Sequence, residues 1–557
     1  CAVSGFGSDR RGRNGREDRS GPDPVAEPDP QCDTTRTTPG IRTHIVPAGS
    51  ARWKENPMSN TTASDPHRPV RLPRRSRQGI VLGMDPWQLA FLAAAAATVL
   101  IGVNRFGPLG LVYAAPLYLL LGGASVATWH GVSAPKMAGL WVMKQLRHVA
   151  GATEQKFRPE APRLEGTLNL PGVRASIQLW ESGGMACVYN PQDRTVSVTA
   201  ELEVQGFLMH DSPERYDLAQ QWSRVLASFT QRPGVKRVTL QERTLPTTIR
   251  PARDHYDTVR TRQHLDADSP VAANYAAVMD QSERFAVAHR NYLTFTLDLV
   301  ALGAQLKSLG GGRDAIITLA TIEAGNLADA LHAARIRVRS WLNPRQVAAL
   351  ARVAFDPDFA ATVQNRTGAL QEGVDPAGIG PMYLEEPKGR NGVVLTDSGA
   401  HSTMWIHEWP RSDAPVGFVS PLVFARHPGT GEAVTHIFSI VLTPVPVNRA
   451  LKRIRDEKKV WRGNEHLRAK RGAEGSAADA ADWDALEKQE QEIVEGHGEF
   501  RYGGYLTITA PTEEQLDAAI AGARNALSRA GMEGQILYCQ QAEALMVNAL
   551  PVGLGMR

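Results

Sequence analysis

The chain has 557 residues, too many for one compact domain, and a net charge of only +4, which gives no electrostatic argument for a nucleic-acid-binding protein. Its four cysteines are widely separated, at Cys1, Cys32, Cys187 and Cys539, without a CxxC pair or a spaced Cys/His set. This pattern indicates neither a zinc site nor a disulfide framework and is typical of reduced cytosolic thiols.

Residues 1–80 are rich in Arg, Asp, Pro, Gly and Ser and have almost no apolar periodicity, so this tail is predicted to be disordered. A first residue Cys1 is compatible with a lipid-modified mature cysteine, a fragment, or a gene model that begins too early. We favour the last, because Met58 followed by a short polar lead has the position of a natural start.

Two apolar runs, Trp87–Val103 and Pro108–Trp129, are each near the roughly 20 residues that a helix needs to cross the hydrocarbon core. With a four-residue break at Asn104–Gly107 they predict a transmembrane helical hairpin at 81–130. Between them lies Arg105, whereas many basic residues flank the hairpin on the outside, so we expect a multi-pass protein of the cytoplasmic membrane with both termini in the cytoplasm. A buried hairpin of a soluble protein is the alternative. The outer basic residues are Arg71, Arg74, Arg75, Arg77, Lys136, Lys144, Arg147, Lys156 and Arg158.

Residues 131–260 are predicted to form a juxtamembrane helix, about 136–149, and a first α+β lobe. Trp141 of this helix, with Trp87 and Trp129, is expected at interface depth. Alternation over 195–204 indicates a half-buried strand, with 185–189 as its hairpin partner. A helix start at Ser212-Pro213 and a returning strand around Val238 complete the order strand, strand, helix, strand, which favours a ferredoxin-like arrangement.

A middle lobe, residues 261–391, is predicted to be mainly helical and packed against a sheet. Ser269-Pro270 begins a helix through Phe285, and alternation over 293–299 indicates a strand. Gly310–Gly312 precedes a helix to about Ala334, and Asn343-Pro344 begins another that ends before Asp356-Pro357.

The C-terminal lobe, residues 392–557, is predicted to contain strands at 402–409, 437–445, 505–510 and 535–539. Thr512 to Gln515 has the spacing of a capping box before a helix that ends at Gly531, and a last helix reaches Leu550. Between strands, the basic stretch 448–471 and the acidic stretch 482–495 predict a protruding antiparallel helix pair, 448–495.

Lys452, Arg455 and Lys459 on this pair are the predicted partner-binding residues. A solvated helix neutralised by its acidic neighbour is the alternative interpretation. Direct nucleic-acid binding is not expected, because Trp461 is the one aromatic residue among these basic side chains.

Motifs for catalysis and cofactor binding are missing from the sequence. No phosphate-binding loop occurs, and the triplet Gly310–Gly312 lacks a following Lys-Ser/Thr. His401, His407 and Glu408 fall on one predicted strand, where the two histidines share a face, but they lack the spacing of a metalloprotease helix and have no evident third ligand. We therefore predict a non-enzymatic protein without metal or cofactor.

The stretch from Met58 to Arg557 resembles a family of actinobacterial two-span membrane proteins from conjugation-like secretion clusters. The resemblance rests on Ala351–Pro357, on Thr396–Trp405 running into Glu408–Arg411, and on the tail from Cys539 to Leu545. A weaker resemblance, carried by Glu543–Pro551, is to the domain that precedes the motor in type IV secretion ATPases of the CagE/TrbE/VirB kind.

These resemblances imply a non-enzymatic inner-membrane scaffold of a type IV-like secretion system. Its expected partners are the lipid bilayer, a separate ATPase and other membrane subunits, in an oligomeric complex. A type VII secretion membrane subunit is an alternative within the same class, and a membrane-anchored hydrolase built on His407 and Glu408 is one from a different class.

Overall fold

The described part of the chain mixes helices and antiparallel strands, which confirms the predicted α+β class. The predicted tail, 1–80, lies outside it. The computed structural model describes residues 86–129, 131–157, 167–168, 176–203, 209–232, 234–264, 266, 268–283, 286–366, 372–410, 414–470, 477–496 and 498–555.

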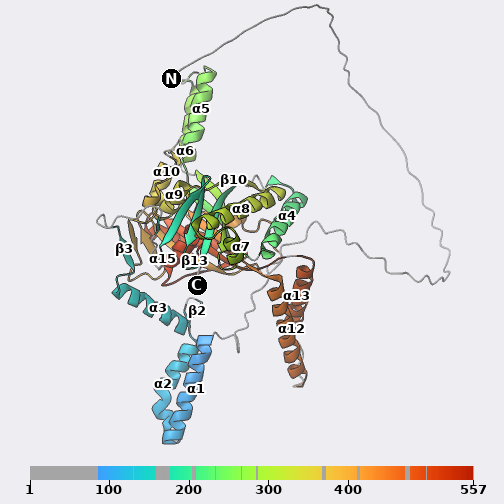
Figure 1. Cartoon of the computed structure of the whole chain (residues 1–557). Coiled ribbons are helices and arrows are strands. Elements are labelled where there is room, and N and C mark those ends of the chain that lie inside the picture. Colours follow the sequence, from blue (N-terminus) through green and yellow to red (C-terminus); the bar gives the residue numbers. More distant parts are fainter. Residues whose placement is uncertain are drawn as a thin grey trace, which may run out of the picture. The chain divides into compact units, whose positions relative to one another are not determined.

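Two apolar helices, α1 (Pro86–Phe106) and α2 (Leu109–Val126), pack against each other (Figure 1). Both are long and apolar enough to cross a membrane, as the sequence predicts. A Cβ added to Gly110 would lie 1.9 Å from the carbonyl oxygen of Gly102, so the absence of a side chain there permits the helices to approach closely.

The break between these helices is shorter than predicted. Helix α1 continues through Asn104 and Arg105, and Gly107 and Pro108 alone separate it from α2. Gly107 has a φ of 60°, a left-handed conformation that ends a helix readily because glycine has no Cβ.

Fourteen strands of the described chain form one large sheet in which all pairs are antiparallel. They are β3 (Glu154–Lys156), β4 (Thr167–Leu168), β5 (Ile177–Ser182), β6 (Met185–Asn190), β7 (Thr195–Glu203), β8 (Val235–Pro246), β9 (Val287–Asp298), β10 (Arg337–Trp341), β11 (Tyr383–Glu385), β12 (Val394–Thr396), β13 (Ala400–Glu408), β14 (His436–Val445), β15 (Glu499–Ala510) and β16 (Glu533–Ile536). Their order is β3-β11-β12-β13-β15-β14-β8-β9-β7-β6-β5-β4, with β10 also on β7 and β16 also on β13. A separate two-stranded antiparallel sheet, β1 (Thr128–Trp129) with β2 (Val132–Ser133), follows α2.

The remaining α-helices connect and cover these strands. They are α3 (Ala134–Val149), α4 (Ser212–Thr230), α5 (Arg250–Arg262), α6 (Pro270–Glu283), α7 (Gly303–Ser308), α8 (Gly312–Ala333), α9 (Pro344–Phe355), α10 (Ala360–Gln364), α11 (Ser420–Val423), α12 (Val447–Lys470), α13 (Ala477–Val494), α14 (Glu513–Arg529) and α15 (Gln541–Ala549).

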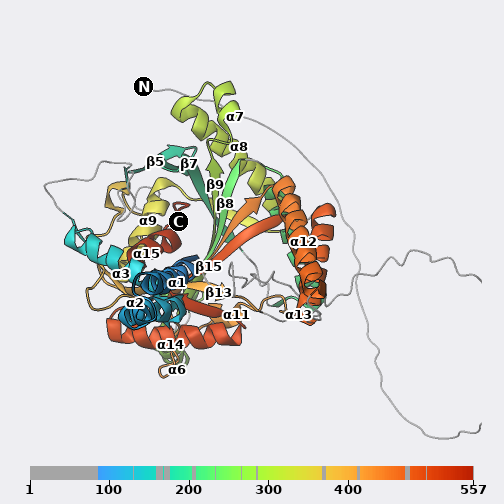
Figure 2. The same cartoon turned by 90° about the horizontal axis from the view of Figure 1, so that it is seen from below.

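The body repeats one order of elements. The first set is β5-β6-β7-α4-β8-α5-α6-β9-α8-β10-α9, interrupted only by the short α7, and the second is β11-β12-β13-α11-β14-α12-α13-β15-α14-β16-α15. The order of neighbouring strands in the sheet is also the same in the two sets: β10-β7-β9-β8 in the first and β16-β13-β15-β14 in the second. The sets join where β8 pairs with β14, from Thr244 opposite His436 to Val238 opposite Leu442 (Figure 2).

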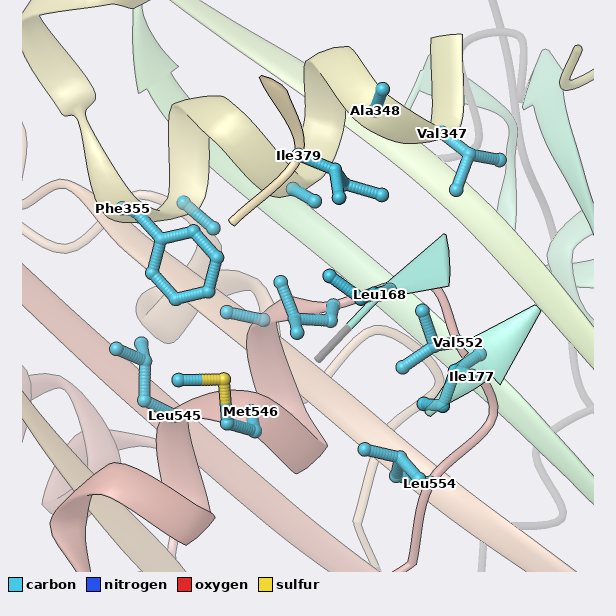
Figure 3. Close-up of a cluster of buried hydrophobic side chains, with 14 of the residues drawn as sticks. Leu168, Ile177, Val347, Ala348, Phe355, Ile379, Leu545, Met546, Val552 and Leu554 are labelled. Carbon is cyan, nitrogen blue, oxygen red and sulfur yellow. The ribbon is translucent and has the colours of Figure 1, made fainter. Parts of the chain in front are cut away.

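Helices cover both faces of the sheet. On β14, Phe438 belongs to the core under α14 and Leu442 to the core under α4 and α8; their even spacing puts these helices on one face. Ile437 points to the other face, where α9 and α15 pack together with the chain end around Val552 and Leu554 (Figure 3).

The sheet crosses both predicted lobe boundaries, at 260/261 and at 391/392. Strand β9 of the predicted middle lobe pairs with β7 and β8 of the first lobe, and β14 of the C-terminal lobe pairs with β8. Long-range strand pairing, which local patterns do not report, therefore joins the three stretches into one sheet.

Most predicted element starts are confirmed. Asn343 and Gln346 form a reciprocal capping box on α9, Ser269 accepts from the Ala272 N–H of α6, and Thr512 accepts from the Gln515 N–H of α14.

Several predicted boundaries need correction or fall outside the described residues. Strands β9 and β15 begin at Val287 and Glu499, each six residues before the predicted start. Helix α4 is capped by Asp211, not Ser212, because the Asp211 carboxylate accepts from the N–H of Glu214. Helix α13 begins at Ala477, five residues before the predicted position 482. Phe285, the predicted end of α6, is not among the described residues.

Candidate partner-binding surface and its links to the membrane hairpin

The charged helix pair, α12 with α13, is inserted between β14 and β15 (Figures 1 and 2). A small apolar cluster of Ala450, Ile454 and Ile493 packs at its base. Arg453 holds α12 to the start of β15 through Glu499 at 2.5 Å. Burial raises the pKa of Glu499, and the charge of Arg453 opposes that rise. The pair is therefore attached to the sheet by packing and by an ion pair.

Opposite charges meet between the two helices. Lys458 donates to Glu490 at 2.6 Å, and this hydrogen bond lowers the pKa of Glu490. The rings of Trp461 and Trp483 lie 4.7 Å apart, with the Arg462 guanidinium 5.5 Å from the Trp483 ring. The predicted antiparallel helix pair is confirmed. Some of its opposite charges already form ion pairs with each other between the two helices.

The three predicted partner-binding residues lie together on α12. Lys452, Arg455 and Lys459 are all exposed, and their spacing of three and four residues places them on one helix face. This face is turned away from Ala450 and Ile454, which are fully buried. Lys459 also contacts Asp456 one turn earlier, at 3.2 Å. The structure thus presents a compact basic face, which we call the α12 basic face.

Helix α3 links the apolar hairpin of α1 and α2 to the body through a buried lysine. The Lys144 ammonium donates to the Pro387 carbonyl at 2.7 Å, to the Asn391 side chain at 3.0 Å and to the Arg390 carbonyl at 3.3 Å. Burial lowers the pKa of Lys144, and nearby Glu386 opposes that effect. Lys144, one of the basic residues expected to flank the hairpin in the cytoplasm, therefore anchors α3 to the body from a buried position.

Glu386 is the second part of this link. Its side chain is 2% exposed, lies 3.2 Å from the Arg147 guanidinium of α3, and accepts from the Ala542 N–H in the first turn of α15 at 2.8 Å. One carboxylate thereby joins the helix that follows the apolar hairpin to the N-terminus of a buried helix, where negative charge is favourable.

The C-terminal end of α15 is held where β8 pairs with β14, a junction between the two repeats that we call the seam. Gln241 on β8 donates to the carbonyl of Asn548, and Arg243 donates to the carbonyl of Ala549. These are last-turn carbonyls without intrahelical partners. Arg243 also donates to the Leu350 carbonyl of α9 at 3.1 Å. Burial lowers the pKa of Arg243 to about 10.

A second polar cluster crosses the seam on the opposite face. Glu242 on β8 accepts from Thr244 at 2.7 Å, contacts His289 on β9 at 3.1 Å and lies 3.3 Å from His436 Nε2 on β14. The other ring nitrogen of His436, Nδ1, is 2.7 Å from the Val434 carbonyl. Because a carbonyl only accepts, Nδ1 donates there.

The pKa of Glu242 predicts an acid-sensitive seam. Burial acts to raise this pKa, but hydrogen bonds from the histidines and Thr244 outweigh it and hold the pKa at about 2. Because the pKa of Glu242 is lower in the folded protein than in the unfolded chain, ionisation of Glu242 stabilises the fold. The full stabilisation, about 3 kcal/mol, is present above the unfolded pKa of about 4.5 and is lost as the pH falls towards 2.

We therefore expect Glu242→Gln to be destabilising at pH 5, with a difference from wild type that shrinks by about half or more at pH 3. Denaturant unfolding of both proteins at the two pH values measures this. Glu214→Gln is the control, because Glu214 contacts His210 at 2.8 Å on the surface and should give almost no difference at either pH. If the loss of unfolding free energy in Glu242→Gln is the same at both pH values, Glu242 is not ionised in the folded protein and the prediction is wrong.

The two histidines considered as a candidate centre, His401 and His407, are not brought together. His401 is buried between Thr396 at 2.7 Å and Thr509 at 2.9 Å, and burial lowers its pKa to about 3, so it is neutral. His407 lies six residues along the same strand, about 20 Å away at 3.3 Å per residue.

His407 lines a cavity of about 190 Å³ with Arg524 and Tyr538. Its Nε2 atom lies 3.4 Å from Glu533. Among the described residues no group of three or more His, Cys, Asp or Glu is placed to hold a metal ion. Gly310–Gly312 joins α7 to α8, not a strand to a helix.

Comparison of the chain with protein-family models and with curated proteins gives no match.

Proposed function

We propose that this chain is a non-enzymatic scaffold of the cytoplasmic membrane that docks a separate ATPase of a conjugation-related, type IV-like secretion system. The observation that carries the proposal is the α12 basic face, formed by exposed Lys452, Arg455 and Lys459 on an inserted helix pair. Two helices able to span a membrane support the location. In this proposal both termini are cytoplasmic and the sheet is the cytosolic body.

We further propose that the body contains two ferredoxin-like units related by duplication. In support, each repeat has strand neighbours in the order fourth, first, third, second, with helices after the first and third strands. In each unit a helix pair, α5/α6 or α12/α13, is inserted between the second and third strands. Such insertions can carry different partners on a common scaffold.

Charge reversal tests the docking proposal. Replacing Lys452, Arg455 and Lys459 with Glu should weaken binding of the cognate ATPase by at least about tenfold at low salt, and much less at high salt, because exposed charges act through a screened field. Titrating the ATPase against the detergent-solubilised full chain at two ionic strengths measures the effect.

A matched triple variant controls for net charge. Arg262, Arg524 and Arg529 are exposed on other helices, and their replacement with Glu changes the net charge equally. This control should leave binding within about twofold. If the α12 variant also binds normally, and deletion of 448–495 has no effect, the ATPase docks elsewhere and the proposal is wrong.

A further inference from the structure

Helix α3 has two unlike faces. Lys144 and Arg147 point into the body, where they contact Pro387, Asn391 and Glu386. On the opposite side are large apolar side chains that the rest of the described protein leaves uncovered. Their exposed fractions are 49% for Trp141, 48% for Val142, 58% for Leu146 and 86% for Val149.

The spacing of these residues makes one continuous apolar face. Val142, Leu146 and Val149 follow each other at intervals of four and three residues, and Trp141 adjoins them. At 100° per residue this group is centred roughly 180° from Lys144 and Arg147. The helix is thus amphipathic, with its polar face already occupied by the body.

The chain itself indicates what covers the apolar face. Helix α3 begins eight residues after α2 ends at Val126, and it contacts both α1 and α2 (Figure 1). The intervening β1–β2 turn carries Trp129, which is 64% exposed. A helix that begins so close to the end of a membrane span is held at the depth of the lipid headgroups, where Trp is favoured.

We infer that α3 lies in the membrane interface with Trp141, Val142, Leu146 and Val149 among lipid, and holds the body against the bilayer through Lys144 and Arg147. Interfacial helices commonly direct their basic residues at lipid headgroups. Here the basic side chains hold protein instead, so the helix fixes the orientation of the sheet relative to the membrane. The inference rests on the membrane location proposed above.

Photo-crosslinking in lipid nanodiscs tests this inference with the full chain. The photoreactive residue p-benzoylphenylalanine is placed at Leu146, at Leu120 of α2 and at Tyr275 of α6; all three native side chains are exposed, by 58%, 65% and 49%. After irradiation, mass spectrometry measures phospholipid adducts. We expect adducts at Leu146 and Leu120 and at least about tenfold fewer at Tyr275.

The outcomes separate the inference from the membrane proposal. Lipid adducts at Leu120 without adducts at Leu146 would overturn the placement of α3 and leave the membrane hairpin intact. Crosslinks from position 146 to a second copy or to another protein, in place of lipid adducts, would show that protein covers the apolar face of α3 and would overturn its placement in the membrane interface. Absence of adducts at Leu120 would overturn the membrane location, and the inference with it.

Discussion

Replacing Arg243 with methionine should lower the free energy of unfolding by about 3 kcal/mol or more. The substitution keeps much of the side-chain volume but removes donors to buried carbonyls of Leu350 and Ala549 and to the Gln241 side chain. Unsatisfied carbonyls at the end of α15 would then lie in the seam between the repeats. Thermal unfolding of the full chain in detergent should show a Tm lower by roughly 3 °C.

Arg339→Met is the matched control for this prediction. Arg339 is 62% exposed and lies 3.4 Å from Glu201, so its loss should cost at most about 1 kcal/mol. Equal Tm values for the two variants would show that the buried guanidinium does not hold α15 to the sheet.

Replacing Glu386 with alanine should destabilise the protein by about 2–4 kcal/mol and loosen the connection between α3 and α15. The change removes the acceptor for the Ala542 N–H and leaves Arg147, and nearby Lys144, without a carboxylate. Hydrogen exchange followed by mass spectrometry should show faster exchange in peptides covering 134–149 and 541–549.

The adjacent Glu385 provides the control. It is the last residue of β11, directly before Glu386, is partly exposed and accepts from Tyr383 instead of holding α3 or α15. Glu385→Ala should leave exchange in both helices unchanged. Similar acceleration by both variants would attribute the effect to β11 as a whole and would contradict a specific role for Glu386.

Local signals in the sequence predicted individual elements well. Asn343-Pro344 marks the start of α9 because a side-chain acceptor and a fixed φ both favour a helix N-terminus. Alternation correctly predicts a strand at Leu293 and Phe295, but the intervening Thr294 and Thr296 are buried as well, because helices cover both faces of the sheet. The three basic residues of α12 could also be predicted to share a face, because helical spacing alone determines that.

Contacts between distant residues could not be predicted in the same way. Gln241 and Arg243 belong to a polar stretch, Gln241–Thr244, that is typical of an exposed strand segment, but α15, some 300 residues later in the chain, covers them. Lys144 and Arg147 look like membrane-flanking charges until Glu386 and Asn391 are placed beside them. Burial of such groups depends on long-range packing, to which local periodicity is insensitive.

The pairing of β8 with β14 also determines which fragments of this chain can remain soluble. Cutting the chain between the repeats would leave β8, Val235–Pro246, or β14, His436–Val445, as an exposed edge strand of its sheet. A long uncovered strand margin offers unpaired backbone N–H and C=O groups to any other chain and promotes aggregation. Each repeat therefore covers the edge strand of the other, and either repeat alone is expected to self-associate.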